Sequence, residues 1–254
     1  MGVGHAHALY VHEHSFIHRL PPETKVLGVL LFVAAIAVTP REAIWAFAIY
    51  AAIEVVVVIS ARVPFTFVLS RLLTVVPFVL FALFLPIIGE GKDVVFVGIP
   101  LSSEGVWSMW NILAKSVLGA TASILLAAST EVPDIVRGFG RLRVPAVITG
   151  IASFMIRYLE VIAGELTRMR TAMVARGYDP RWLSQARPIA SSAGTLFVRS
   201  YERGERVYDA MLSRGYTGEM PAIDSRTTSA GEWAVALFLP LIAIATAVTA
   251  FVTL

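Results

Sequence analysis

The chain of 254 residues contains no cysteine, and only three of its 21 basic residues are lysine. Without cysteine it cannot be a disulfide-stabilised secreted scaffold or a thiol-based redox enzyme. Charged residues make up only 15% of the chain and hydrophobic residues 57%, whereas soluble domains have about 25% and about 45–50%. A chain so rich in hydrophobic residues is not a disordered protein. Its few polar residues could not cover a fold of this size in water, so the composition indicates a membrane protein.

Five apolar runs are long enough to be considered as membrane spans. They cover residues 25–38, 44–60, 65–88, 105–128 and 232–254. A span needs about 20 apolar residues, so the first run is short and must use residues from Pro22 onward. The third run is interrupted by Pro77 and Pro86. We therefore predict an all-α membrane protein with about five transmembrane helices and, between the fourth and fifth, a domain of amphipathic helices.

Residues 129–231 differ in composition from the rest of the chain, because they hold 14 of the 21 basic and 10 of the 18 acidic residues. Within them, residues 144–156 form an apolar stretch that is too short to span a membrane alone, and could be half-buried or re-entrant. The predicted division is an N-terminal segment (1–24), four spans (25–128), a helical domain (129–231) and a last span (232–254).

The positive-inside rule gives the orientation. With the N-terminus inside, all basic residues outside the spans except Arg41 and Lys92 fall on the cytoplasmic side. We therefore expect residues 1–24 and 129–231 to be cytoplasmic.

A short direct repeat lies in the arginine-rich segment. Residues 172–178 read Ala-Met-Val-Ala-Arg-Gly-Tyr, and residues 210–216 read Ala-Met-Leu-Ser-Arg-Gly-Tyr. Apolar residues recur every three or four positions before each copy, at Ile162, Leu166, Met169 and Met173 and at Phe197, Tyr201, Gly204, Tyr208 and Met211, which predicts two amphipathic helices.

Each copy predicts a helix end that presents an arginine. Arg176 and Arg214 follow a methionine of the stripe by three residues, which continues the apolar face. Gly177 and Gly215 are suited to the left-handed position after a helix, and Pro180 and Pro221 prevent its continuation. One such arginine would be read as a simple cap, but two copies indicate two equivalent sites on a dimeric partner.

These motifs resemble the transmembrane (T) component of energy-coupling factor transporters, most closely the cobalt-transport CbiQ family, over nearly the whole chain. Residues 18–25 (His-Arg-Leu-Pro-Pro-Glu-Thr-Lys) resemble the family's His-Arg-Leu-Asp-Pro-Arg-Thr-Lys, with Pro21 and Glu23 as departures. Thr130 to Pro145 resembles the family's first coupling-helix region, and Ile156 to Leu159 with Glu165 matches the stretch before the first Ala-Arg-Gly motif. That motif stands intact at Ala175, Arg176 and Gly177, and the second is changed to Ser213, Arg214 and Gly215.

The resemblance implies a multi-pass protein of the bacterial cell (inner) membrane that couples a separate ATPase to transport. The implied partners are a dimer of ABC-type ATPases (CbiO-like), a substrate-binding membrane subunit (CbiM-like) and a small accessory membrane subunit (CbiN-like). Each motif arginine would meet acidic groups in a groove of the ATPase dimer. Cobalt is the implied substrate, and nickel or a vitamin handled by a shared module is the alternative.

The chain itself has no phosphate-binding loop, because residues 89–92 (Gly-Glu-Gly-Lys) lack the required spacing. We therefore expect a non-catalytic subunit that binds no cofactor, with ATP and Mg used by the partner, and no nucleic-acid binding. A membrane-embedded enzyme would need acidic metal-binding clusters at the membrane edge, and none is present in the sequence. A self-contained carrier would need inverted repeats, whereas the repeat here is direct.

Two further groups of residues could carry a function. His5, His7, His12 and His14 could chelate a divalent metal, but the expected cytoplasmic N-terminus favours a flexible polar segment over an uptake site. Glu54 and Lys115 lie inside predicted spans, where charges are costly. They could pair with each other or contact the substrate-binding subunit.

Overall fold

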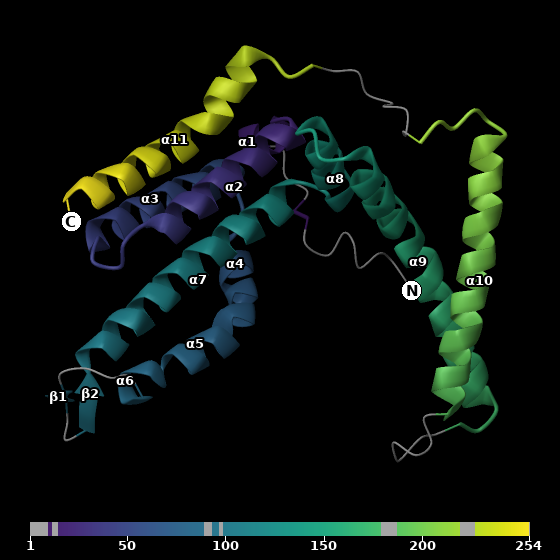
Figure 1. Ribbon diagram of the computed structural model, residues 1–254, viewed down its shortest axis with the longest axis horizontal. Coiled ribbons are helices and arrows are strands. Elements are labelled where there is room, and N and C mark those ends of the chain that lie inside the picture. The colour runs from purple at the N-terminus through teal and green to yellow at the C-terminus, as the bar shows by residue number, and fades with distance from the viewer. Residues whose placement is uncertain are drawn as a thin grey trace. The chain divides into compact units, whose positions relative to one another are not determined.

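The computed structural model describes residues 10–11, 15–88, 93–96, 99–178, 187–218 and 227–253 (Figure 1). Within these ranges the regular secondary structure is helical apart from one short antiparallel hairpin, which the sequence did not predict. The prediction of an all-α membrane protein is confirmed. The elements are α1 (Phe16–Arg19), α2 (Pro22–Val38), α3 (Ile44–Ala61), α4 (Phe65–Leu72), η2 (Leu73–Val75), α5 (Val76–Ala82), α6 (Leu85–Ile88), β1 (Asp93–Phe96), β2 (Ile99–Ser102), α7 (Ser103–Ser129), α8 (Val132–Arg141), α9 (Ala146–Ala175), α10 (Arg187–Leu212) and α11 (Ala230–Thr253).

The chain divides into two compact units, which are described separately. The first, called the bundle here, contains α1 to α8, the hairpin and α11. The second, called the helix pair, contains α9 and α10. The sequence passes from one unit to the other at three points, between Ala8 and Leu9, between Leu142 and Arg143 and between Ser225 and Arg226.

Five helical segments are long and apolar enough to cross a membrane. They are Ile44–Ala61, Phe65–Ile87, Ser103–Ser129, Ala146–Ala175 and Ala230–Thr253. Four of them match predicted runs. The first predicted run forms α2, which begins at Pro22 as expected and has 17 residues. At 1.5 Å per residue it is about 25 Å long, shorter than the hydrocarbon core of about 30 Å.

The fifth segment, α9, changes the interpretation of residues 144–156. This stretch is not a separate short element but the start of a continuous helix of 30 residues. Pro145 precedes the first turn, where its fixed backbone is tolerated, and the helix ends only at Ala175, two residues before the left-handed Gly177. The apolar beginning and the charged remainder of α9 are therefore one rigid element.

Helix α2 lies at the centre of the bundle, where it packs against α7, α8 and α11. Phe32, Ile36 and Tyr50 fill the core with small residues of α11, Ala243, Ala247 and Ala250. A Cβ on Gly28 would lie 3.4 Å from the carbonyl oxygen of Ala236, so the small residues allow α2 and α11 to approach closely. The Tyr50 hydroxyl is buried within 2.8 Å of the Thr39 hydroxyl, which satisfies both polar groups.

Candidate functional site

The two copies of the repeat form the ends of α9 and α10. Gly177 and Gly215 have φ angles of +78° and +83°, so both adopt the left-handed conformation expected of them. At the first end the Met173 carbonyl accepts a hydrogen bond from the Tyr178 amide (3.1 Å). The Val174 carbonyl accepts one from the Gly177 amide (2.9 Å). This is a Schellman motif, which closes the last turn of a helix.

The second helix end has the same hydrogen bonds. The Met211 carbonyl accepts from the Tyr216 amide (3.0 Å), and the Leu212 carbonyl accepts from the Gly215 amide (2.9 Å). The methionine and tyrosine are half-buried in both copies, whereas the arginine and glycine are exposed in both. The Gly of the repeat is therefore explained by the left-handed cap, and the Met and Tyr by their half-buried side chains at the same helix end. The identity of the arginine is not explained in either way, since its side chain is exposed and the cap uses only its backbone.

Both motif arginines have exposed side chains. Neither Arg176 nor Arg214 forms a side-chain hydrogen bond or ion pair with any residue that the structure describes. Apolar side chains stand beside them, since Val174 is 63% exposed and Leu212 is 47% exposed. Each helix end therefore offers a guanidinium and an apolar side chain to a partner.

Helices α9 and α10 are antiparallel and are held together near the first arginine end. Arg199 Nη1 lies 2.6 Å from Glu165 Oε1, and the Ser192 hydroxyl lies 3.5 Å from Met173 Sδ. Since α10 has 26 residues, the rise per residue puts the two arginine ends about 30–40 Å apart. In Figure 1 the two ends lie at opposite ends of α10.

The predicted apolar stripes lie mainly on the outside of the helix pair. No described residue of α9 or α10 is buried, and Phe197 and Tyr201 are 71% and 60% exposed. The half-buried face of α10 is a different one, with Ser192, Leu196, Ser200, Arg203 and Val207, and it shares only Met211 with the predicted stripe. The helix pair is thus not a self-contained domain with its own core, and its apolar surface is open to a partner.

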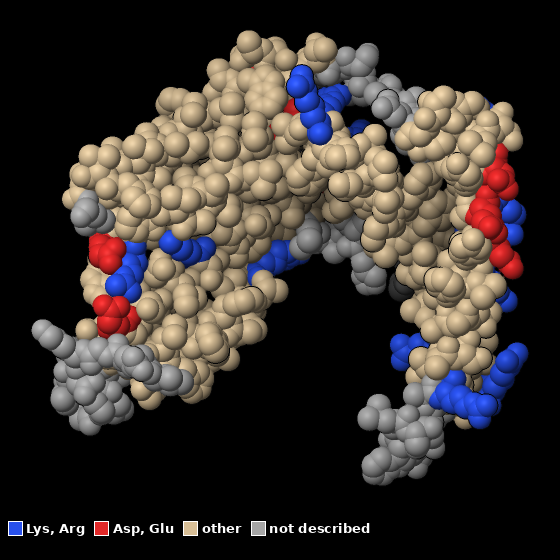
Figure 2. Space-filling model, in the orientation of Figure 1, with Lys and Arg blue, Asp and Glu red and all other residues tan. Residues whose placement is uncertain are grey.

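Charge is unevenly distributed over the helix pair. Figure 2 shows basic side chains gathered at the end of the pair where α9 ends and α10 begins, and acidic side chains farther along α10. The exposed basic residues close to that end in the sequence are Arg168, Arg170, Arg176 and Arg187, and the exposed acids of α10 are Glu202, Glu205 and Asp209.

The structure does not pair the two intramembrane charges. Lys115 donates a hydrogen bond of 2.8 Å to the carbonyl oxygen of Ala37, at the end of α2. Glu54 is buried, and its Oε1 has no hydrogen-bond partner among the described residues. Glu54 lines the same cavity of about 420 Å³ as Ala122, which is seven residues, or about 10 Å, along α7 from Lys115. The predicted pairing is therefore wrong because the register of α3 against α7 separates the two side chains.

The histidine prediction cannot be compared with the structure, since His5, His7, His12 and His14 lie outside the described residues. Among the described residues there is no group of three or more histidine and acidic residues able to hold a metal ion.

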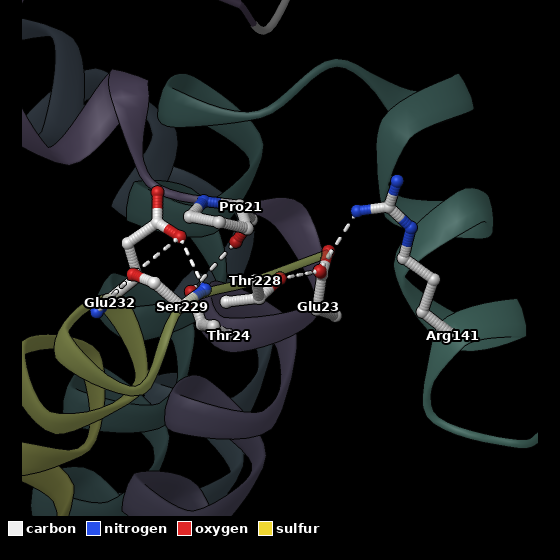
Figure 3. A network of polar contacts seen from close by, with 7 residues as sticks. All are labelled: Pro21, Glu23, Thr24, Arg141, Thr228, Ser229 and Glu232. Carbon is white, nitrogen blue, oxygen red and sulfur yellow. Dashed lines mark hydrogen bonds and ion pairs between the residues drawn. The ribbon is translucent and has the colours of Figure 1, made fainter. Parts of the chain in front are cut away.

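One polar network in the bundle was missed by the sequence analysis. Glu23 accepts hydrogen bonds from Arg141 and Thr228, and Ser229 and Glu232 cap the start of α11 beside it (Figure 3). The partners of Glu23 are 118 and 205 residues away along the chain, so no local pattern reveals them. The only signal was that Glu23 departs from the family's residue at that position.

Comparison with known proteins agrees with the resemblance seen in the motifs. Residues 13–224 match the family CbiQ, described as cobalt transport protein. The energy-coupling factor transporter transmembrane protein EcfT of Thermotoga maritima is 25% identical, over 84% of this chain and 81% of its own length. EcfT of Bacillus subtilis is 27% identical, over 82% and 83%. A putative fused cobalt transport protein CbiMQ of Methanocorpusculum labreanum is 27% identical, over 52% of this chain but only 22% of its own length.

Proposed function

The chain belongs to the CbiQ family of cobalt transport proteins, and we propose that it acts as the coupling subunit of an energy-coupling factor importer. In this role it transmits ATP-driven movement of a separate ATPase dimer to a substrate-binding membrane subunit. The observation that carries the proposal is the pair of identical helix ends, each with an exposed arginine that has no ion-pair partner among the described residues.

The antiparallel arrangement fits a partner with two-fold symmetry. Two helices that run in opposite directions and end in the same structure are related by an approximate two-fold axis between them. A dimer of identical or similar ATPases offers two equivalent grooves related in the same way. Arg176 would enter one groove and Arg214 the other, and each guanidinium would make a forked, charge-assisted contact with an acidic group.

The open apolar faces of the helix pair supply a surface for the substrate-binding membrane subunit. Side chains such as Phe197, Tyr201 and Leu166 are more than half exposed, and a monomeric protein seldom leaves so many large apolar side chains in water. A movement of the ATPases at the arginine ends would then reach the substrate-binding subunit through rigid helices. Glu54 and Lys115 remain candidates for a contact with that subunit inside the membrane.

We propose that residues 129–231 are cytoplasmic, including α9, although α9 is long and apolar enough to cross a membrane. Its apolar beginning, before Arg157, has only 11 residues and a length of about 16 Å. Arg157, Glu160 and Glu165 follow, and charges near the membrane centre cost about 2.5–3.5 kcal/mol each. The proposed orientation places the N-terminus inside a bacterial inner membrane and both arginine ends in the cytoplasm.

The chain is a transporter component, and we propose that its partners carry out the chemistry. ATP and Mg would be bound by CbiO-like ATPases, since the sequence contains no phosphate-binding loop of its own. The substrate would be held by a CbiM-like subunit, with a CbiN-like accessory subunit. The family description and the fused relative favour cobalt as the substrate. The relatives named EcfT are described as energy-coupling factor transporter transmembrane proteins with no substrate in the name, so a shared module for nickel or vitamin uptake is the second candidate.

Purification of the tagged chain from native membranes tests the proposal. The expected result is an ABC-type ATPase and a second multi-pass membrane protein in stable complex with it, and ATP-dependent Co²⁺ uptake by vesicles that contain the complex. Absence of any ATPase from the complex would contradict the coupling role. Uptake of nickel or a vitamin without cobalt would support the second candidate.

A further inference from the structure

Glu23 contacts residues that lie close in the sequence to two of the points where the chain passes between the bundle and the helix pair. Its side chain is only 5% exposed, at the first turn of α2, and its Oε1 lies 2.9 Å from Arg141 Nη1. The same oxygen accepts a hydrogen bond from the Thr228 hydroxyl (Figure 3). Arg141 is the last residue of α8 and stands one residue before the crossing at Leu142, and Thr228 stands two residues after the crossing at Arg226. One carboxylate therefore contacts a bundle residue beside each of these two crossings.

The first connection is held tightly against Glu23. A Cβ on Gly138 of α8 would lie 3.1 Å from the amide nitrogen of Glu23, so α8 packs closely on the beginning of α2. Beyond Arg141, Arg143 has a left-handed φ of +66°, a conformation that is costly for a residue with a Cβ.

The second connection is fixed to α11 directly after Thr228. The Ser229 amide donates to Glu232 Oε2 (2.8 Å), and the Glu232 amide donates to the Ser229 hydroxyl (3.3 Å). These reciprocal bonds form a capping box, which fixes the direction in which the chain enters α11. A force on the chain at Thr228 is therefore passed to the whole of α11.

The carboxylate depends strongly on these two contacts. The hydrogen bond from Thr228 and the ion pair with Arg141 compensate for the burial of its charge. Its second oxygen, Oε2, is buried without a hydrogen-bond partner among the described residues. Since a buried charge needs compensation, loss of either donor should disturb the other contact as well.

We infer that Glu23 is the positioning residue that couples α9 and α10 to the bundle, because it ties Arg141, just before α9, and Thr228, which follows α10 in the chain, to the beginning of α2. This inference rests on the proposed function. When the helix pair is moved by its partner, the clamp formed by Glu23, Arg141 and Thr228 passes the movement to α2, α8 and α11 together. Without the clamp, the two connections would become flexible, and movement of the helix pair would not be transmitted to the bundle.

The test compares variants of the clamp in the full transporter complex. Glu23→Ala and Arg141→Ala remove the ion pair, Glu23→Gln keeps an acceptor without the charge, and Thr228→Val removes only one hydroxyl and should fold in any case. Arg41→Ala is the matched control. Its side chain is 33% exposed compared with 31% for Arg141, and it forms an ion pair of 3.1 Å to Glu104, within the bundle but beyond the opposite end of α2.

Two measurements are made on each complex. Amide hydrogen exchange should become at least about tenfold faster, or about 1.4 kcal/mol, at residues 138–142 and 227–232, and remain unchanged elsewhere in the bundle and in Arg41→Ala. Co²⁺ taken up per ATP hydrolysed should fall about fivefold or more in Glu23→Ala while the ATPase stays bound, with partial retention in Glu23→Gln.

Unchanged exchange at either connection, or an even increase throughout the bundle, would overturn the inference. The inference would also be overturned if Glu23→Ala or Thr228→Val showed faster exchange at both connections but took up a normal amount of Co²⁺ per ATP. A wild-type chain that binds no ATPase would contradict the proposed function instead.

Discussion

Arg199 of α10 reaches across to α9, where its Nη1 lies 2.6 Å from Oε1 of Glu165. Arg168 Nη2 lies 2.8 Å from the other oxygen of the same carboxylate. Arg168 and Glu165 both belong to α9, so the pair of Arg199 with Glu165 is the one ion pair between α9 and α10 among the residues that the structure describes. Glu165 therefore fixes how the two helices cross, and with that the separation of the two arginine ends.

Replacing Glu165 with alanine should loosen the helix pair without affecting insertion of the bundle. Since the chain lacks cysteine, spin labels can be placed at Val174→Cys and Leu212→Cys, which are exposed beside the two arginine ends. We expect one narrow distance distribution in the parent chain and a broad one in Glu165→Ala. Glu205→Ala, an exposed acid of α10 outside any described ion pair, should leave the distribution narrow. A narrow distribution in Glu165→Ala would show that apolar contacts alone set the crossing.

Replacing either capping glycine with alanine should be destabilising, although there is space for the added Cβ. Nothing lies within 4 Å of a Cβ added to Gly177 or Gly215, so the cost comes only from the left-handed backbone. We expect Gly177→Ala and Gly215→Ala to destabilise the caps by about 1 kcal/mol each, with faster amide exchange at Tyr178 and Tyr216. Gly194→Ala is the control, since this helical glycine also has open space and should gain stability. Equal effects at all three positions would argue against the left-handed cap as the cause.

The orientation of α9 can be tested with single cysteines on either side of it. Gly140 lies before α9 and Gly194 lies after it, and both are exposed. If α9 does not cross the membrane, Gly140→Cys and Gly194→Cys will both resist an impermeant thiol reagent in intact cells and will both react in inverted vesicles. Glu42→Cys, in the loop between α2 and α3, should show the opposite pattern. Labelling of Gly194→Cys from outside would mean that α9 spans the membrane.

The N-terminal histidines should not be required for uptake, because the proposed orientation places them in the cytoplasm. We expect replacement of His5, His7, His12 and His14 by alanine to leave the rate of Co²⁺ uptake largely unchanged. Loss of most uptake, with normal amounts of the assembled complex, would assign a metal site to this segment.

Features that depend on neighbouring residues could be predicted from the sequence, and those that depend on distant contacts could not. The apolar runs and the two glycine caps are local patterns, and the helices and their ends follow them closely. The pairing of Glu54 with Lys115 failed because it depends on the register between α3 and α7. The Glu23–Arg141 contact joins residues 118 positions apart, so no local pattern predicts it. The sequence analysis divided residues 144–175 by composition, whereas the structure has the apolar and the charged part in one helix, α9.

The arginine ends themselves are expected to supply most of the specific contact with the ATPase. A forked contact that is lost with the partner acid left buried typically costs about 2–5 kcal/mol. We expect Arg176→Ala and Arg214→Ala each to weaken transport, and lysine at either position to restore it only in part, because lysine keeps the charge without the fork. Ser213→Ala should behave as the parent, since both side chains are small.

The most direct test of the coupling role is the amount of ATPase that copurifies with the tagged double variant Arg176→Ala, Arg214→Ala. The control Arg170→Ala, Arg206→Ala removes the same charge from exposed positions on the same two helices. We predict that the double variant inserts normally but loses its ATPase or hydrolyses ATP without uptake, while the control retains both. A double variant that binds the ATPase and transports at the normal rate would contradict the account.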